Sequence, residues 1–121
     1  MTTAVVILGH GSKSPKALET LQMYCEMVKG ASSYEIVEVA SLQFNKPDLS
    51  ETLDCVIEQG ADRVIIMPLF LYNGIHMQQD IPQLIAEEKV KNPNVEIVVT
   101  SNLGADNRIV EIVLDRIRGV S

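Results

Sequence analysis

Apolar runs rich in β-branched residues alternate along the chain with segments of helical periodicity, and this alternation most constrains the fold. The runs are short and unbroken by polar residues, as in strands buried on both faces of a parallel sheet. They are Ala4–Leu8, Ile36–Ala40, Val64–Met67 and Val95–Thr100. Because each run is followed by a helical segment, the sequence predicts a βαβαβαβα order and an α/β fold.

Apolar residues spaced three and four apart predict the helices. These segments cover about Pro15–Lys29, Asp48–Gln59, Ile81–Val90 and Asn107–Arg118. Right-handed crossovers then predict a four-stranded parallel sheet in the order 2-1-3-4, with helices on both faces. No linker or repeat interrupts the pattern, so residues 1–121 are expected to form a single domain.

The composition of the chain argues against two classes of partner, nucleic acids and membranes. The net charge of −6, the aromatic content of 4% and the lack of tryptophan argue against a nucleic-acid partner. No apolar run approaches the ~20 residues needed to cross a bilayer, so no membrane partner is expected. The first residues lack the basic and small-residue pattern of a signal peptide, which favours a cytoplasmic location.

Two cysteines, Cys25 and Cys55, fall within helical segments. They could ligate a metal or form a disulfide, but the chain has no CxxC pair and no zinc-type cluster. The simpler interpretation is that both are small core residues in a reducing compartment.

Two histidines follow the first and third predicted strands. His10 stands between two glycines in LGHGS, and His76 lies in PLFLYNGIHMQQDIP. In open α/β sheets, ligands bind beyond the carboxyl ends of the strands, where the connections diverge. With the order 2-1-3-4 this switch point lies between strands one and three, so both imidazoles are expected to overhang one crevice.

Two neutral imidazoles suit a divalent metal ion such as cobalt, nickel, ferrous iron or zinc. Without thiolates they leave the coordination sphere open, whereas a structural zinc site is closed by four ligands. The pattern therefore favours a site that holds a metal briefly and passes it on as a substrate. Asp80, four residues after His76, either orients an imidazole or caps the third helix, with Pro82 in its first turn.

Other functions fit the same histidines. A non-catalytic carrier or sensor of divalent metal would use both imidazoles without any chemistry. A histidine phosphotransferase would need arginines to hold the phosphate, and none lies near His10 in the sequence. The phosphate-binding pattern GxxxxGK[ST] is missing, and no organic cofactor is expected.

Four segments in combination resemble one family. LGHGS follows the first strand, NKPDL opens the second helix, MPLFLYNGIHMQQDIP spans the end of the third strand, and GADNRIVEIVLDRI lies near the end. Together they look like the short, single-domain sirohydrochlorin cobaltochelatases, which are class II tetrapyrrole chelatases with nickel-inserting relatives. The resemblance covers nearly the whole chain and implies a chelatase-like fold, equivalent to one half of a two-lobed member. It also implies ATP-independent insertion of cobalt, nickel or ferrous iron into sirohydrochlorin by a homodimer, in cobalamin-type cofactor biosynthesis.

The resemblance assigns metal binding and catalysis to His10 and His76. Where many members carry a glutamate after the second strand, this chain has Gln43 in SLQFNKP. An amide cannot take a proton at neutral pH, although it can hydrogen-bond to substrate or to a metal-bound water. Removal of the pyrrole protons is then expected to fall to the imidazoles, which exchange protons near neutral pH.

The tetrapyrrole is expected to lie over the histidines in a cleft between two copies of the chain. Leu69 and Phe70 are expected to flank it, and Ser12 and Ser14 offer hydroxyl groups. Its carboxylates would be attracted by the basic residues of the same edge, which are Lys13, Lys16, Lys46 and Arg108. The residues expected to line the substrate site are Gly11, Ser12, Gln43, Lys46, Leu71, Tyr72, Asn73, Gly74, Ile75 and Met77.

Overall fold

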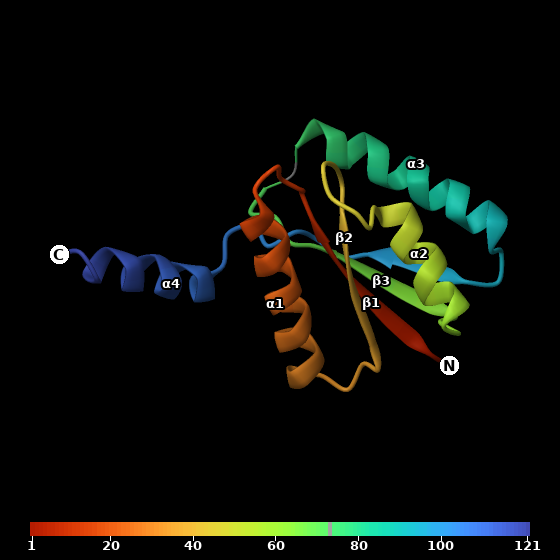
Figure 1. The fold of residues 1–121 in the computed structure, drawn as a ribbon, viewed down its shortest axis with the longest axis horizontal. Helices are drawn as coiled ribbons and strands as arrows, with labels where there is room; N and C mark the ends of the chain where they lie inside the picture. The colour runs from red at the N-terminus through yellow and green to blue at the C-terminus, as the bar shows by residue number, and fades with distance from the viewer. Residues whose placement is uncertain (73) are drawn as a thin grey trace.

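The computed structural model describes residues 1–72 and 74–121, without the side chains of residues 76 and 77. Within these residues the chain forms four strands and four helices in the predicted alternating order (Figure 1). The elements are β1 (Thr3–Gly9), α1 (Pro15–Ala31), β2 (Ile36–Ser41), α2 (Leu49–Glu58), β3 (Arg63–Pro68), α3 (Ile75–Lys91), β4 (Glu96–Val99) and α4 (Asn107–Arg118). None of the helices in the described part of the chain is long and apolar enough to cross a bilayer.

The strands form one parallel sheet in the order β2-β1-β3-β4, which confirms the predicted topology. β1 is central, and its end is level with those of both neighbours, because Leu8 pairs with Ala40 of β2 and with Pro68 of β3. The loops that follow these three strands therefore leave the sheet at one edge. That edge is where the switch point was predicted.

Each face of the sheet has its own apolar cluster. On one face, Leu21 and Cys25 of α1 pack against Val5, Ile7 and neighbouring residues of β1 and β2. On the other face, α2 and α3 cover a larger cluster. Its buried residues include Val6, Leu8, Leu49, Leu53, Val64, Ile66, Ile81 and Ile97. Helices thus lie on both faces, as predicted, with α1 packed on the β1 and β2 part of its face.

α4 covers neither face. The helix projects away from the sheet beside the start of α1 (Figure 1), and none of its residues, all of which the structure describes, is buried. Its bounds match the periodicity of the sequence. Its position outside the body of the domain was not predicted.

α3 begins earlier than the sequence indicated. It starts at Ile75 instead of Ile81, so His76 lies in its first turn and not in a preceding loop. The interpretation of Asp80 as the cap of this helix is therefore wrong, because the N-cap residue is Gly74. Pro82 lies inside the helix, where it has no N–H to donate to the carbonyl of Gln78 one turn earlier.

The two cysteines differ in their surroundings. Cys25 is buried under α1, where its thiol donates a hydrogen bond to the carbonyl of Val37 (3.2 Å) and burial raises its pKa. Cys55 is exposed on α2, so its assignment to the core is wrong. The buried residues of α2 are Leu49, Thr52, Leu53 and Val56, and position 55 falls outside this stripe.

A buried carboxylate joins α2 to α3. Glu88 of α3 is only 1% exposed, and its Oε1 accepts hydrogen bonds from Ser50 Oγ (3.1 Å) and Lys91 Nζ (3.2 Å). Its Oε2 is buried without a hydrogen-bond partner in the described part of the chain. Because Ser50 belongs to α2 and Glu88 to α3, this buried hydrogen bond fixes α3 against α2.

A capping box begins α2. Asp48 Oδ1 accepts the backbone N–H of Glu51 (2.9 Å), and Glu51 Oε1 accepts the backbone N–H of Asp48 (3.0 Å). The hydrogen bond from Glu51 N–H, supported by the ammonium group of Lys46, holds the pKa of the Asp48 carboxyl below its usual range. The start of α2 therefore depends on an ionised Asp48.

We expect Asp48→Ala to lower the free energy of unfolding by about 1 kcal/mol at pH 7, the usual value of an N-cap carboxylate. Because the native pKa is depressed, this stabilisation is present above the ordinary aspartate pKa near ~3.9 and is lost as the pH falls through the native value. Urea unfolding of both proteins between pH 7 and pH 2.5 measures the difference, with Glu58→Ala at the far end of α2 as the control. A constant difference at all pH values would contradict the assignment.

Candidate functional site

Three loops meet at the carboxyl edge of the sheet. Backbone hydrogen bonds extend the strand pairing into them, from Leu42 N to Gly9 O (3.0 Å) and from Leu69 N to Leu8 O (2.8 Å). The residues after β1, β2 and β3 are thus tied together before the chain diverges to α1, α2 and α3. This is the place that the sequence predicted for ligand binding.

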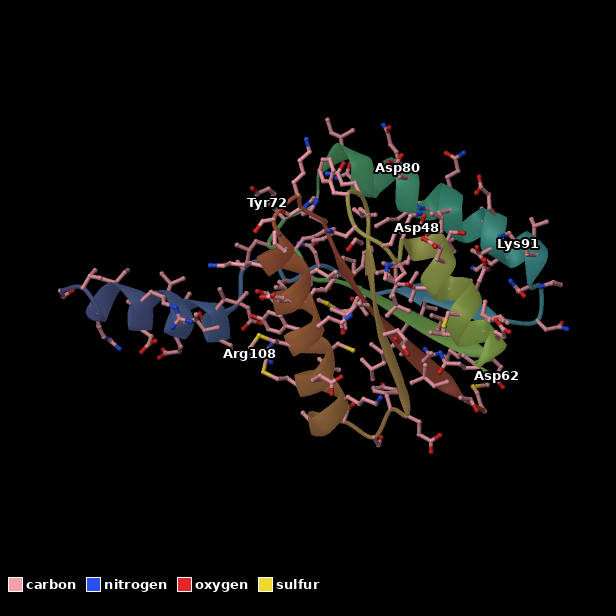
Figure 2. The ribbon with its side chains drawn as sticks, viewed as in Figure 1. Asp48, Asp62, Tyr72, Asp80, Lys91 and Arg108 are labelled. Carbon is pink, nitrogen blue, oxygen red and sulfur yellow. The ribbon has the colours of Figure 1, made fainter. Side chains whose placement is uncertain are left out.

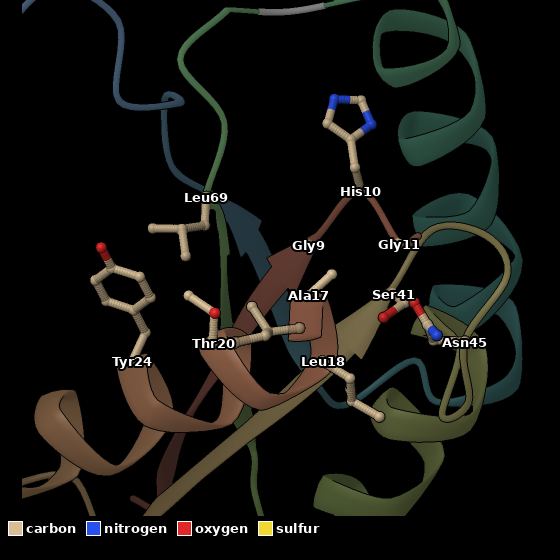
Figure 3. Close-up of a pocket in the computed structure, with 11 residues that line it drawn as sticks. Gly9, His10, Gly11, Ala17, Leu18, Thr20, Tyr24, Ser41, Asn45 and Leu69 are labelled. Atoms are coloured by element: carbon tan, nitrogen blue, oxygen red, sulfur yellow. The ribbon is translucent and has the colours of Figure 1, made fainter. Parts of the chain in front are cut away.

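His10 stands at the centre of this edge. Its imidazole is exposed and stacks on the buried ring of Phe70, with 4.0 Å between the ring centroids and 26° between the planes. Figure 3 shows the ring directed away from the floor formed by Ala17 and Thr20 of α1. The stack fixes the orientation of the imidazole and leaves its nitrogens accessible at the ring edge.

Hollows lie on both sides of His10. The α1-side hollow, about 180 Å³, is drawn in Figure 3. Its lining residues are Gly9, His10, Gly11, Ala17, Leu18, Thr20, Leu21, Tyr24, Ser41, Asn45 and Leu69. The α3-side hollow is larger, about 320 Å³. Its lining residues are His10, Leu42, Gln43, Asp48, Leu49, Ser50, Asp80, Ile81 and Leu84.

The structure brings three of the predicted site residues to the α3-side hollow. His10 comes from the β1 loop, Gln43 from the β2 loop and Asp80 from α3. The backbone of His76 lies in the first turn of the same helix, one turn before Asp80. Its side chain lies outside the described residues, as do Asn73 and the side chain of Met77. The meeting of the two imidazoles therefore stays a prediction.

Gly11 packs directly on the neighbouring loop. Its φ of 88° lies in the left-handed region, and a Cβ at this position would overlap the carbonyl oxygen of Gln43. Only glycine both adopts this left-handed backbone without strain and leaves room for the carbonyl oxygen. The glycine after His10 is therefore needed to bring the β1 and β2 loops into contact, which sets the distance from His10 to Gln43.

We expect Gly11→Ala to displace the β2 loop and to lower the free energy of unfolding by about 1–3 kcal/mol, the cost of a strained backbone and of the overlap. Gly30→Ala is the matched control, because a Cβ at Gly30 meets nothing within 4 Å and alanine favours a helix. Urea unfolding of the three proteins tests this. Equal stability of Gly11→Ala and the wild type would contradict the role of Gly11.

Asn45 is a site residue that the sequence analysis missed. Its side-chain oxygen accepts the backbone N–H of Ser12 (2.9 Å), and Ser12 Oγ in turn accepts the backbone N–H of Ser14 (3.0 Å). Ser14 is the N-cap of α1 without a side-chain cap bond. The motif NKPDL could have predicted this contact, since the side chain of an asparagine before a proline-containing turn often hydrogen-bonds to backbone groups.

The four basic residues predicted at this edge differ in their contacts. Lys46 pairs with Asp48 (3.3 Å) and Glu51 (3.0 Å), and Arg108 pairs with Asp106 (2.7 Å). Hydrogen bonding from Arg108 also holds the pKa of the Asp106 carboxyl well below its usual range. Lys13 instead lies over the ring of Phe44 at 5.5 Å, and Lys16 is exposed near the start of α1. Lys13 and Lys16 are therefore better placed than Lys46 and Arg108 to meet an anionic ligand.

Large apolar side chains surround the mouth of the site. The exposed fractions are 61% for Phe44, 55% for Leu71, 77% for Tyr72 and 73% for Ile75. Figure 2 shows Tyr72 at the same end of the molecule as Asp80, whereas Asp62 lies at the opposite end of the sheet. Phe44 is held in the left-handed region (φ 68°), which is costly for an aromatic residue. Exposed apolar residues gathered at one edge mark a surface for an apolar ligand.

The described residues contain no group of three or more His, Cys, Asp or Glu side chains arranged around a common metal position. The fold and the site together define a doubly wound α/β domain with an exposed histidine at its switch point and an apolar rim. A family model for CbiX matches residues 4–120, and the chain belongs to this family.

Similar proteins include a sirohydrochlorin cobaltochelatase of Methanococcus aeolicus, which is 36% identical over 96% of this chain and 98% of its own. Among solved structures, the sirohydrochlorin chelatase SirB of Bacillus subtilis subspecies spizizenii in complex with cobalt matches 99% of this chain with a TM-score of 0.92 and 28% identity. SirB of Bacillus subtilis with Fe3+ matches 100% of it with a TM-score of 0.90 and 27% identity. This chain spans 51% and 48% of those two chains, about half of their length.

Proposed function

We propose that this protein inserts a divalent metal ion, cobalt first, into sirohydrochlorin or a closely related tetrapyrrole. Nickel and ferrous iron are the alternative metal substrates. The observation that carries the proposal is the exposed His10 imidazole at the switch point, surrounded by exposed Phe44, Leu71, Tyr72 and Ile75. This edge offers a metal ligand and an apolar platform to a flat macrocycle.

In this mechanism His10 and His76 hold the incoming metal. Imidazole nitrogens bind cobalt, nickel and iron well, and a site with two protein ligands keeps positions free for water and then for the ring nitrogens. The proposal is supported by the backbone of His76, which lies in the first turn of α3, and Asp80 lies one turn further along that helix. We assign Asp80 to orienting one imidazole from the α3-side hollow.

The macrocycle would lie across the apolar rim, over the metal. Leu71, Tyr72 and Ile75 offer apolar surface on the α3 side of His10, and Phe44 offers it from the β2 loop. Phe70 acts beneath His10, and its buried ring is a support for the imidazole more than a contact for the substrate. Gly11, Ser12, Asn73, Gly74 and Met77 complete the proposed lining.

Proton removal completes the reaction. Two pyrrole N–H protons leave as the metal passes to the ring nitrogens, so the macrocycle gains one dication and loses two protons. Gln43 lines the α3-side hollow and offers hydrogen bonds to a metal-bound water, but its amide takes no proton. The imidazoles, freed of metal, are the groups that accept the protons. Juxtaposing metal and macrocycle supplies the remainder of the catalysis.

We further propose that the chain is one half of a two-lobed site and acts as a homodimer in the cytoplasm. The length supports this, because the chain spans about half of the SirB chains while matching almost all of its own residues to them. Free Cys25 and Cys55 suit a reducing compartment. A second copy facing the apolar rim would close the macrocycle between two such edges.

We expect His10→Ala and His76→Ala each to lower the rate of cobalt insertion into sirohydrochlorin by at least tenfold, because each removes a metal ligand and a proton acceptor. The absorption change of the macrocycle, followed with and without enzyme, measures the rate above the spontaneous reaction. Tyr34→Phe, at the opposite end of the sheet, is the control and should keep the wild-type rate. Cobalt binding with no acceleration by the wild type would indicate a carrier and would overturn the proposal.

Lys13→Ala and Lys16→Ala are expected to raise KM for sirohydrochlorin several-fold and to leave kcat nearly unchanged. Each lysine would attract a substrate carboxylate, an effect that weakens as salt rises. Lys29→Ala, in the last turn of the same helix, is the matched control because it lies far from the site. Initial rates at low and high ionic strength give both parameters. A KM insensitive to both lysines would exclude this role.

A further inference from the structure

α4 is an amphipathic helix without a partner inside the chain. Its apolar side chains form one broad face, with the charged residues gathered mainly on the other side. The exposed apolar residues of α4 and its end are Val110, Ile112, Val113, Ile117 and Val120. A helix of 12 residues is marginal in water unless its apolar face is packed. The apolar face of α4 therefore needs a packing surface that the helix does not find in its own chain.

The body of the domain has an uncovered surface of matching character. α1 packs on β1 and β2, but on the same face of β3 and β4 the side chains of Ile65, Met67 and Val98 stay partly exposed, although Met67 also packs against the edge of the α1-side cluster. Beside them, α1 exposes Met23, Tyr24 and Met27 along one flank. We call these six residues the receptor face. Both faces of a parallel sheet are usually covered by helices, and here one helix is missing from this place.

The segment between β4 and α4 keeps α4 away from the receptor face of its own chain. Leu103 N donates to Phe70 O (2.9 Å), and Asn102 Nδ2 donates to Leu71 O (3.1 Å). These bonds fix the segment to the β3 loop, and from there α4 points outward past α1 (Figure 1). Figure 2 shows Arg108, at the start of α4, beside α1.

We propose that two copies of this chain exchange α4, so that the apolar face of each α4 lies on the receptor face of the other copy. The exchange supplies the helix that the sheet lacks and buries both apolar surfaces at once. It is reciprocal, as a two-fold interface requires, because each copy gives one helix and receives one. The inference rests on the proposed homodimer, but it does not depend on the reaction.

The likeness to a longer chain supports a second copy as the occupant. The match to the cobalt-bound SirB chain includes the projecting α4, because it covers 99% of this chain at a TM-score of 0.92. That chain has about as many residues again beyond the matched half. In the SirB chain, a helix placed like α4 is therefore accompanied by a second unit of about the size of this chain.

The test compares a variant on each surface. Ile117→Lys places a charge on the apolar face of α4, and Met27→Lys places one on the receptor face. Both side chains are exposed within their own chain, so each variant should fold, which circular dichroism and thermal unfolding check. We expect light scattering coupled to size exclusion to give twice the chain mass for the wild type and one chain mass for each variant. Asp115→Asn, with the same charge change on the polar side of α4, should stay dimeric.

Mixing the two variants gives a sharper result. A mixed pair has one intact α4 on one intact receptor face, so dimers should reappear in the mixture although neither variant dimerises alone. A monomeric wild type would overturn the proposal. So would a dimer that resists Met27→Lys, because two copies joined through α4 alone would not need the receptor face. These readouts are independent of metal insertion, so failure of the exchange and failure of the proposed reaction give different results.

Discussion

β1 is the strand on which the other parts of the structure depend, because it hydrogen-bonds to β2 on one side and to β3 on the other. Its register places Leu8 level with Ala40 and Pro68, so that the chain leaves all three strands at one height. Apolar side chains on both of its faces hold it between α1 and the pair α2 and α3. A shift of one residue would send Val5 and Ile7 to the wrong layer and His10 away from Phe70.

The orientation of His10 follows from this register together with two short contacts. Phe70, two residues beyond β3, provides a buried ring beneath the imidazole. Gly11, one residue beyond His10, allows the β2 loop to touch the β1 loop. The imidazole is thus fixed through its face and its backbone, while its nitrogens stay accessible. Such fixing before a ligand arrives lowers the entropy lost on binding.

Most of the fold could be predicted from the sequence because the apolar patterns of its strands are unambiguous. The start of α3 was missed because the described side chains of its first turns, those of Ile75, Gln78, Gln79 and Asp80, are all exposed, and because Pro82 resembles a helix start. The position of α4 could not be predicted either. Periodicity shows that a helix has an apolar face, but it does not show whether that face meets the same chain.

The candidate site was predicted in outline for a similar reason. Strand order and loop position placed His10, Gln43 and Asp80 at one edge, and the α3-side hollow brings them together. The engagement of Lys46 and Arg108 by carboxylates two to five residues away was not foreseen, because local ion pairs depend on the turn geometry of the loops. The hydrogen bond between Asn45 and Ser12 was missed for the same reason, because it too depends on the turn geometry of the loops.

The contact between Gly11 and Gln43 has a consequence for how this site can diversify. The atoms nearest to a Cβ placed at Gly11 all belong to the main chain of residue 43, so the close approach of the two loops does not depend on the identity of that side chain. An amide and a carboxylate of equal length are therefore interchangeable in space at this position. Related chains are free to acquire or discard a negative charge beside the histidine without rebuilding the scaffold that carries it.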